Sequence, residues 1–379
     1  MRVLYLTMNP NRESTTVPTE GWFRLLRGRG LEPILVSSRS GAFQAWAREQ
    51  GIPSYEVPLP FPNRARPWTF LKSLARVVAI GRRHGVQLVH CNEHDIYPIG
   101  QYAARLLRVP VVVSVHFTLR DGFSRWAFRG NRAPDRAFFV SATSFAACAP
   151  DLAGVLPDSR CRVLYNGLDL SRYRPDPGLR AAFRSEHGLG DGLVAGAACA
   201  LRPRKQLEHL FRCAAALPSL HVVLAGGPVK GDEDYAAALI AEGRQVLGGR
   251  LLHLGHLREL RPMYNALDLF LNTSQEESFG LSVLEAMACG SPVVGYPSVS
   301  VAEVVGGSGV IVRQDDERAL VSAVSSVVSD PGLRSTMRQA ARVRACEFDI
   351  GCIADQLWTE YQDLAPSTGV TSSTRAVNR

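Results

Sequence analysis

Two glutamates eight positions apart, Glu277 and Glu285, bracket the segment of this chain whose residue types and spacing point most clearly to chemistry. The segment follows an apolar run at residues 267–271, and Gly280 is predicted to open a helix that reaches about Cys289. The free N–H groups and the dipole of such a helix start form a phosphate site. Because glutamate oxygens accept hydrogen bonds from vicinal hydroxyls, one ligand could place a sugar at Glu277 and a ribose at Glu285. The same pair is also compatible with a helix-favouring glutamate followed by a solvated one.

The elements that must position these residues alternate strands and helices in both halves of the chain. Runs typical of buried strands lie at 3–6, 33–37, 88–91, 109–115 and 137–141, and again at 193–200, 221–225, 251–254, 267–271, 292–295 and 310–313. Amphipathic stretches such as 70–83 and 99–107 lie between them. This alternation predicts an α/β fold with two doubly wound, Rossmann-like domains, each a parallel sheet covered by helices on both faces.

The domain organisation follows from the position of a turn-rich connection. Residues 165–175 carry an Asn-Gly turn and a terminal proline, so we expect one domain at 1–168 and a second at 169–349. A helix at about 350–365 is expected to pack back on the first domain, and the Ser/Thr-rich tail at 366–379 is expected to be disordered. Ligands of parallel sheets bind beyond the carboxyl ends of the strands, so a cleft between the two domains is the expected place for chemistry.

The run Glu277-Ser-Phe-Gly-Leu-Ser-Val-Leu-Glu285 resembles the signature of retaining GT-B glycosyltransferases of family four, the glycosyl transferases group 1. The resemblance implies the GT-B fold and a retaining transfer of a sugar from a nucleotide diphosphate sugar, most often a UDP- or GDP-sugar, to an acceptor hydroxyl. It also implies that Glu277 contacts the donor sugar, that Glu285 contacts the donor ribose, and that Phe279, Gly280 and Leu281 bring backbone amides to the donor. Cell-surface polysaccharide, glycolipid or secondary-metabolite glycoside synthesis is the implied setting.

A second family segment reads Ala200-Leu-Arg-Pro-Arg-Lys205-Gln. In the family a lysine and an arginine five residues before it hold the donor diphosphate. Lys205 matches the lysine, but Ala200 stands at the arginine position. Arg202 and Arg204 are the candidates for the missing cation, and Arg202 is the preferred one. A further departure is Gln206, where the family prefers glycine.

A third match places a histidine at the end of the apolar run 109–115. In the family the equivalent histidine lies beside the reacting sugar, which adds His116 to Lys205 and Glu277 in the implied catalytic set. A histidine at a strand end is otherwise usually a satisfied structural group. Glu93 and His94 follow another apolar run and are acceptor candidates by position alone.

The loop at residues 9–21 departs from the family, because it lacks the Gly-Gly pair that lets the backbone approach the donor phosphate and the acceptor. Two alternative functions of other classes therefore stay open beside that of a glycosyltransferase. One is a GT-B nucleotide-sugar epimerase, or a phosphorylase that needs inorganic phosphate. The other is a sugar-nucleotide-binding protein without catalysis.

No metal and no cofactor are expected, since the nucleotide sugar is itself a substrate. Asp232-Glu-Asp234 resembles the D-x-D of metal-dependent transferases, but it more simply begins a helix at 235–246, where the dipole favours acidic residues. Lys205, a nearby arginine and a helix start would then stabilise the departing diphosphate. The family implies that the acceptor attacks from the face that the diphosphate leaves, and that a donor phosphate oxygen takes the acceptor proton.

The net charge of +8 is concentrated in the first half of the chain, where residues 1–170 hold 22 Lys and Arg against 12 Asp and Glu. This asymmetry favours an anionic partner, and it also fits an arginine-rich composition without a partner. Aromatic and basic residues mix at 64–72 and 120–132, which suits a lipid-linked acceptor or peripheral contact with an anionic membrane, or else ordinary helix packing. No nucleic-acid partner is predicted.

We expect a cytoplasmic enzyme that can also bind peripherally to the inner face of the membrane. The eight cysteines are scattered without C-x-x-C spacing, which is typical of reduced thiols. No stretch approaches the roughly 18 apolar residues of a membrane span, and residues 1–8 lack a signal-peptide cleavage region.

Overall fold

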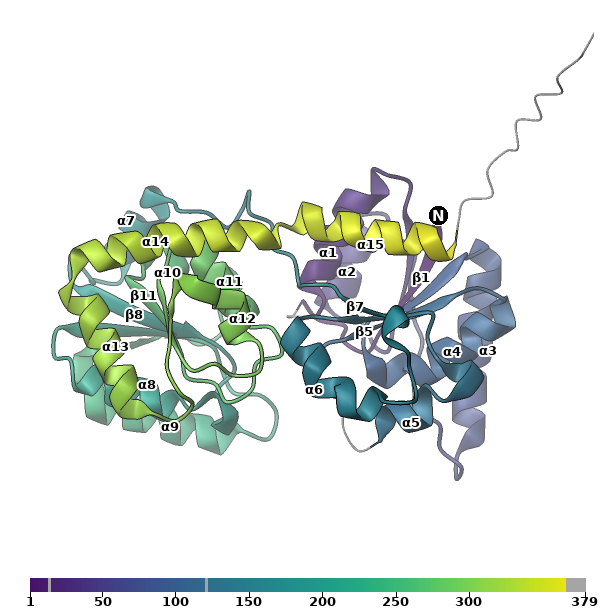
Figure 1. Cartoon of the computed structure of the whole chain (residues 1–379), viewed down its shortest axis with the longest axis horizontal. Coiled ribbons are helices and arrows are strands. Elements are labelled where there is room, and N and C mark those ends of the chain that lie inside the picture. The colour runs from purple at the N-terminus through teal and green to yellow at the C-terminus, as the bar shows by residue number, and fades with distance from the viewer. Residues whose placement is uncertain (13–14, 120–121, 366–379) are drawn as a thin grey trace, which may run out of the picture. The chain divides into compact units, whose positions relative to one another are not determined.

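A computed structural model of the chain describes residues 1–12, 15–119 and 122–365, and it contains two compact units (Figure 1). Unit 1 comprises Met1–Phe139, Ala149–Leu164 and the chain from Gly351 onward, and unit 2 comprises Val140–Cys148 and Tyr165–Ile350. The division at Leu164 falls a few residues before the boundary expected from the sequence. The prediction for residues 366–379 lies outside the described residues.

Unit 1 is built on a parallel sheet, for which the described residues give seven strands in the order β3-β2-β1-β4-β5-β6-β7. The strands are β1 (Arg2–Thr7), β2 (Glu32–Ser37), β3 (Ser54–Glu56), β4 (Leu88–Cys91), β5 (Val111–Val115), β6 (Arg136–Phe139) and β7 (Cys161–Val163). The central strands are buried almost throughout, as parallel strands covered on both faces must be.

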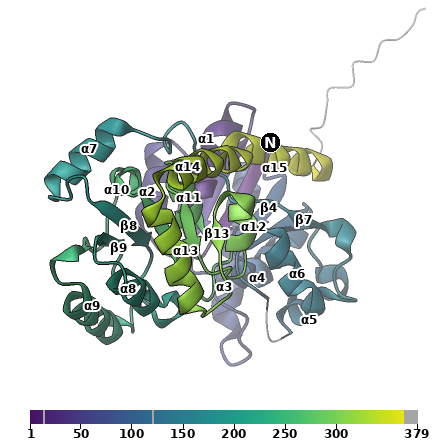
Figure 2. The same ribbon diagram turned by 60° about the vertical axis from the view of Figure 1, so that its left-hand side comes forward.

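The helices of unit 1 lie on both sides of this sheet. They are α1 (Val17–Arg27), α2 (Ala42–Glu49), α3 (Pro67–His84), α4 (Tyr97–Leu107), α5 (Phe123–Ala127), α6 (Ala142–Leu152), whose last residues belong to this unit, and α15 (Ile350–Leu364). Figure 2 shows α1 and α15 on one side of the strands and α3 and α4 on the other. Glu360 of α15 accepts hydrogen bonds from Arg136 Nε at 2.6 Å and from Arg162 Nε at 2.7 Å, which fixes the helix to the strands β6 and β7.

Unit 2 repeats the design around a parallel sheet of six strands, counted over the part of the chain that the structure describes, in the order β10-β9-β8-β11-β12-β13. The strands are β8 (Leu193–Ala198), β9 (Leu220–Ala225), β10 (Leu251–His253), β11 (Leu269–Asn272), β12 (Val293–Gly295) and β13 (Val310–Ile311). The helices are α7 (Pro177–Glu186), α8 (Leu207–Ala215), α9 (Glu233–Leu247), α10 (Arg261–Ala266), α11 (Leu281–Ala288), α12 (Val301–Val305), α13 (Glu317–Ser329) and α14 (Pro331–Ala345).

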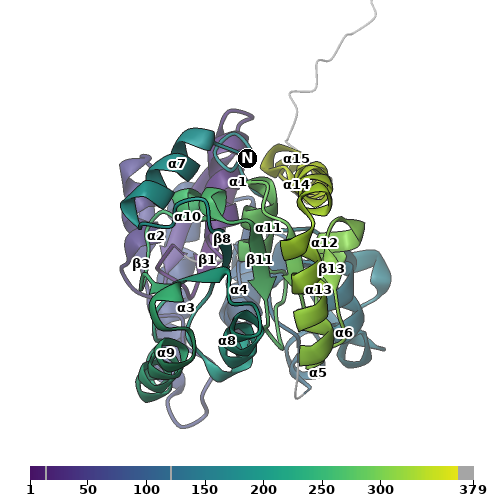
Figure 3. The same ribbon diagram turned by 90° about the vertical axis from the view of Figure 1, so that its left-hand side faces the viewer.

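Alternate residues of the unit 2 strands build two hydrophobic cores, one on each face of the sheet. Val194 and Val223 belong to the core under α10, α11 and α12, whereas Ala195 and Val222 belong to the core under α8, α9 and α13. Figure 3 shows α8 and α9 apart from α10 and α11, with β8 and β11 between them. The predicted fold class, two doubly wound Rossmann-like α/β domains, is confirmed. None of the described helices has both the length and the apolar character that a membrane crossing requires.

Candidate functional site

The switch point of the unit 2 sheet lies between β8 and β11, which pair directly. From β8 the strands follow one another to one edge of the sheet, and from β11 they follow one another to the other edge. A crevice for a ligand forms at such a point, outside the carboxyl ends of the strands. The segments that leave β8 and β11 carry Lys205 and Glu277, so the sheet order explains why two residues 72 positions apart meet.

Lys205 and Glu277 form an ion pair between Nζ and Oε1. The lysine side chain is 8% exposed and the glutamate side chain 19%, so each charge depends on the other. Ser274 Oγ donates to the same Glu277 oxygen at 3.1 Å, and Thr273 Oγ1 donates to the backbone oxygen of Lys205 at 2.8 Å. The cation and the carboxylate are therefore held in place by the loop that follows β11.

The start of α11 lies next to this pair in the chain. Gly280 has φ +86°, and a Cβ there would meet Val301 Cγ2 at 3.1 Å, so the turn into the helix requires glycine. The ring of Phe279 is buried and packs edge-on against Phe348. The N–H groups of Leu281 and Ser282, the first two residues of α11, have no acceptor within their own helix, as at any helix start. The predicted helix from Gly280 to about Cys289 is confirmed, with those two residues as its caps.

Glu285 lies just over one turn inside α11 and is 7% exposed. Burial raises the pKa of its carboxyl to about 7. Tyr264 of α10 donates its hydroxyl to Glu285 Oε2 at 2.8 Å, and Tyr173 also hydrogen-bonds this side chain. Neither tyrosine stands at a fixed spacing from the glutamate, so no motif in the sequence predicts these contacts.

The two arginines near Lys205 differ in what they contact. Arg202 Nε donates to Asp232 Oδ2 at 2.9 Å, so its charge is already matched. Arg204 Nε is buried and has no hydrogen-bond partner among the described residues. Gln206 follows with φ +46°, a left-handed conformation that accounts for a glycine preference at this position.

Asp232 is the residue before α9, as the helix reading of the D-x-D resemblance expected. Within the described residues, no group of three or more His, Cys, Asp or Glu side chains has the arrangement of a metal site.

Unit 1 has a corresponding switch point between β1 and β4. Glu93, directly after β4, is 6% exposed and accepts from Thr7 Oγ1 at 2.8 Å, from the Met8 backbone N–H at 2.9 Å and from Asn92 Nδ2 at 2.8 Å. Burial raises the pKa of this carboxyl to about 7. Glu93 therefore ties the ends of the two central strands together.

Two histidines lie in the same region of unit 1. Burial, with a smaller effect from His94, lowers the pKa of His116 to about 4, so its imidazole is neutral near neutral pH. His116 hydrogen-bonds the backbone of Asn92, and its Nε2 is buried without a partner in the described ranges. The pKa of His94 is also lowered by burial, and its Nδ1 likewise has no partner there. The ring of Phe123 lies edge-on to the ring of His94, with the ring centroids 5.0 Å apart. Each imidazole thus has one buried ring nitrogen whose hydrogen-bonding capacity is not used by the described residues.

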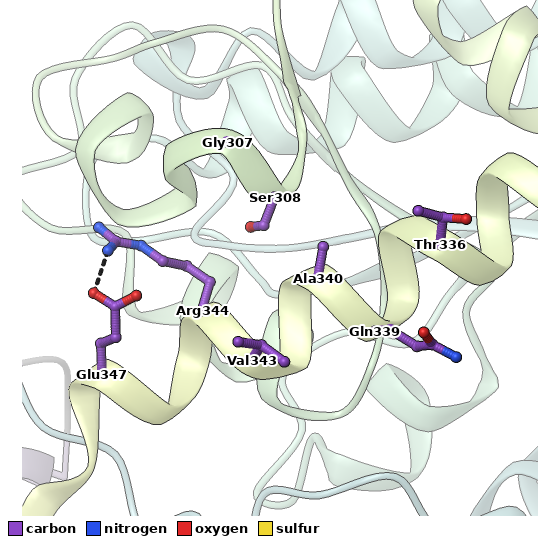
Figure 4. A pocket seen from close by; sticks show the side chains of 8 residues that line it. All are labelled: Gly307, Ser308, Thr336, Gln339, Ala340, Val343, Arg344 and Glu347. Carbon is purple, nitrogen blue, oxygen red and sulfur yellow. Dashed lines mark hydrogen bonds and ion pairs between the residues drawn. The ribbon is translucent and has the colours of Figure 1, made fainter.

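A pocket of about 440 Å³ lies elsewhere in unit 2, between α14 and the short helix η6 (Gly306–Ser308) (Figure 4). Its charged lining residues, Arg344 and Glu347, already pair with each other at 2.5 Å. It is lined by Gly307, Ser308, Thr336, Gln339, Ala340, Val343, Arg344 and Glu347. None of the site residues predicted from the sequence is among them, so this pocket is separate from the switch point.

Two protein-family models match the chain in succession. The model described as Glycosyltransferase Family 4 matches residues 22–172, and the model described as Glycosyl transferases group 1 matches residues 181–344. A D-inositol 3-phosphate glycosyltransferase of Salinispora arenicola is 32% identical over 325 residues, which cover 76% of this chain and 70% of that protein. The chain belongs to this glycosyltransferase family. The resemblance seen in the sequence is thereby confirmed, and the chain is a glycosyltransferase of the GT-B type.

Other relatives of this glycosyltransferase differ in name and extent. The sulfoquinovosyl transferase SQD2 of Arabidopsis thaliana is 25% identical over 349 residues, covering 87% of this chain and 66% of that protein. Further D-inositol 3-phosphate glycosyltransferases match over about half of their own length, 55% and 46% in two cases. Among solved structures, HepE of Anabaena in complex with UDP superposes with a TM-score of 0.85 at 23% identity, covering 96% of this chain and 100% of that one. That likeness supports the fold.

Proposed function

We propose that the chain transfers a sugar from a nucleotide diphosphate sugar to an acceptor hydroxyl with retention of anomeric configuration, and that unit 2 binds the donor. The observation that carries this proposal is the Lys205–Glu277 ion pair next to the start of α11, at the switch point of a doubly wound sheet. A cation and free helix N–H groups suit a diphosphate, and a carboxylate suits sugar hydroxyls.

Each part of the donor has a proposed partner in unit 2. Lys205 and the N–H groups at the start of α11 hold the diphosphate, and Glu277 accepts from the sugar hydroxyls. Glu285 takes the ribose hydroxyls, with Tyr264 orienting its carboxyl. Arg204 replaces the missing family arginine, because its Nε is buried without a partner whereas Arg202 is bound to Asp232. HepE was solved with UDP and with UDP-glucose, which favours a UDP-sugar here.

The proposed reaction breaks the bond between the anomeric carbon and the diphosphate oxygen, and positive charge develops on the sugar ring. The acceptor oxygen attacks from the face that the diphosphate leaves, and its proton passes to a phosphate oxygen of the leaving group. Lys205 and the helix start stabilise the charge that accumulates on the diphosphate, which is a metal-independent way to assist its departure. His116, neutral and with Nε2 unused, accepts a hydrogen bond from a sugar hydroxyl.

An anionic acceptor is the proposed second substrate, with Glu93 and His94 as hydrogen-bond partners of its hydroxyl groups in unit 1. The name of the Salinispora relative specifies D-inositol 3-phosphate, so an acceptor of that kind is a rational first choice. The excess of basic residues in the first half of the chain favours negative charge on the acceptor.

The test is an assay of the full chain with a panel of UDP-, GDP-, ADP- and dTDP-sugars, with D-inositol 3-phosphate as one acceptor, in the presence of EDTA. The proposal expects transfer from one donor class and a product whose anomeric proton coupling in NMR matches that of the donor. An inverted product would contradict retention, and transfer that requires a divalent metal would contradict metal independence.

Three further arms separate the open alternatives. Donor conversion without any acceptor would identify an epimerase, and donor formation or breakdown that depends on inorganic phosphate would identify a phosphorylase. Donor binding without turnover under every condition would identify a non-catalytic protein.

A further inference from the structure

In the basic first half of the chain, residues 57–92 form the longest stretch without an acidic residue. It contains six cations and no Asp or Glu. The cations are Arg64, Arg66, Lys72, Arg76, Arg82 and Arg83. The segment leads from the end of β3 through α3 to β4 in unit 1. Such a segment carries a strong positive potential of its own.

One face of α3 is buried and the opposite face combines large apolar side chains with cations. Phe70, Leu74 and Val77 pack against the unit, as the helical period requires. Trp68 is 78% exposed, the highest value among the large hydrophobic residues, and Leu71 is 47% exposed. Lys72 and Arg76 are also exposed and share this stripe, since positions three and four apart lie on one helix face. Exposed tryptophan beside lysine and arginine is the pattern of a helix that lies in a membrane interface.

The apolar part of this surface continues onto α5. Phe61, which is 47% exposed, stacks on Trp126 of α5 with ring centroids 5.5 Å apart, and Trp126 is itself 42% exposed. Figures 1 and 2 show α5 and the segment before α3 toward the same end of unit 1. Four of the ten large hydrophobic residues exposed in the described structure therefore lie on α3, on the segment that leads into it or on α5, namely Phe61, Trp68, Leu71 and Trp126.

Among the residues that the structure describes, the cations of this surface have no counter-charge. Arg64, Arg66 and Lys72, together with Arg125 and Arg129 around Trp126, make no ion pair within the described ranges. By contrast, the exposed Arg2, Arg29 and Arg212 each pair with a carboxylate. A folded surface that presents aromatic side chains among unpaired cations is complementary to an apolar layer beneath negative head groups.

We propose that this surface, formed by Phe61, Arg64, Arg66, Trp68, Leu71, Lys72 and Trp126, docks unit 1 onto an anionic lipid bilayer. Trp68, Leu71 and Trp126 enter the interface between head groups and acyl chains, and the cations lie at the level of the lipid phosphates. The proposal does not depend on the donor site of unit 2, because no residue of the surface belongs to it.

The experiment is sedimentation of the full chain with vesicles of phosphatidylglycerol and phosphatidylcholine, and with vesicles of phosphatidylcholine alone, at low and high salt. The protein is expected to sediment with the anionic vesicles only, and less so at high salt. Arg64→Gln and Lys72→Gln should each weaken the binding about fivefold. Trp68→Ser should weaken it about tenfold or more, because it removes a large apolar side chain from the interface.

Matched controls exist on helices of unit 2. Arg318→Gln removes an exposed cation of α13, and Val343→Ser removes an exposed apolar side chain of α14; neither should change vesicle binding. All five proteins should bind the sugar nucleotide equally, which shows that they are folded. The proposal is overturned if the wild type ignores anionic vesicles, or if the controls lose as much binding as the surface variants. It is also overturned if the same residues bind a soluble anionic polysaccharide while vesicles are not bound.

Discussion

The two units share a sheet order around their switch points, yet the side chains at these points differ in charge. Unit 2 brings a charged pair, Lys205 and Glu277, to the start of a helix. Unit 1 brings Glu93, His94 and His116, whose pKa values are shifted by burial toward the uncharged forms. The same scaffold therefore offers a charged pair in one unit and, in the other, hydrogen-bonding groups whose charged forms are disfavoured by burial.

The difference has a physical cause that relates to the ligand each unit is proposed to bind. A diphosphate gains most from fixed positive charge, which is costly to bury unless a carboxylate accompanies it. Sugar and acceptor hydroxyls need well-placed hydrogen-bond partners and no net charge. Substitutions that remove charge in unit 2 should thus impair donor binding and chemistry together, whereas substitutions in unit 1 should impair the transfer and spare the donor.

The largest effect is expected for Lys205→Ala. Loss of the cation that stabilises the departing diphosphate should lower kcat/KM for sugar transfer by about 10²–10³-fold. Lys230→Ala, which removes an exposed lysine of the same unit, is the control and should behave as the wild type. Similar rates for the two variants would mean that unit 2 does not use its charged pair in this way.

The two buried carboxyls should make stability depend on pH to a similar extent in both units. The folded pKa of Glu93 and of Glu285 is about 7, above the ordinary value of 4.5, so the folded state holds these protons to higher pH than the unfolded state does. The contribution to stability is fully present below about pH 4.5 and is lost as pH rises through 7, by about 3 kcal/mol for each carboxyl.

Urea unfolding at a series of pH values measures this loss. Relative to the wild type, Glu93→Gln and Glu285→Gln should each become more stable as pH rises from 4.5 to 7, and the difference should level off above pH 7. If the difference in unfolding free energy between either variant and the wild type does not change with pH, burial does not raise the pKa of the corresponding carboxyl.

His116→Ala should separate the units most clearly. Removing a neutral hydrogen-bonding group from unit 1 should lower kcat about 10–100-fold. The dissociation constant of the donor's nucleotide diphosphate, measured by calorimetry, should change less than twofold. Weaker nucleotide binding by this variant would show that His116 contributes to binding the diphosphate. Unit 1 would then share the role proposed for unit 2.

A smaller effect should distinguish the two arginines of unit 2. Arg204→Ala should weaken nucleotide binding about tenfold, since a charge-assisted hydrogen bond is worth about 1.5 kcal/mol. Arg202→Ala should weaken it less than twofold, because Arg202 already bonds Asp232. The reverse ranking would assign the missing family cation to Arg202.

The smallest effects concern two residues with left-handed backbone, Arg108 with φ +59° at the end of α4 in unit 1 and Gln206 with φ +46° beside Lys205 in unit 2. Replacing either by glycine should raise the free energy of unfolding by about 0.5–1 kcal/mol, because glycine adopts this conformation without strain. Only Gln206→Gly should also change donor affinity. An equal effect of Arg108→Gly on donor affinity would contradict the assignment of the donor to unit 2.

Much of the fold could be predicted because its elements are long or strongly apolar. The strand predicted at 88–91 coincides with β4, the helix predicted at about 350–365 is α15, and the other predicted strands agree within a few residues. The strands β3 and β7 were missed, because each has three residues and neither forms an apolar run. Ser54–Glu56, for example, alternates polar side chains at the edge of the sheet, where pairing with β2 alone defines it.

Site residues could be predicted where a sequence motif follows a strand. They could not be predicted where contacts between distant segments determine the partner of a side chain. Lys205 and Glu277 could be picked out because each matches a motif of the family that follows an apolar run, and adjacent strands bring them together. The pairing of Arg202 with Asp232, the unpartnered Nε of Arg204 and the contact of Tyr264 with Glu285 depend on how separate segments pack. The roles of these residues and of His116, Glu93 and His94 in the reaction stay predictions.

The donor site of unit 2 is tested most directly by a calorimetric titration of UDP, GDP, ADP and dTDP into the wild type, Lys205→Ala and His116→Ala in the presence of EDTA. One of these nucleotides is expected to bind the wild type without metal. Lys205→Ala should weaken this binding more than tenfold, and His116→Ala should leave it unchanged. Binding that requires metal and ignores Lys205→Ala, or that is lost in His116→Ala alone, would contradict a donor site at the switch point of unit 2.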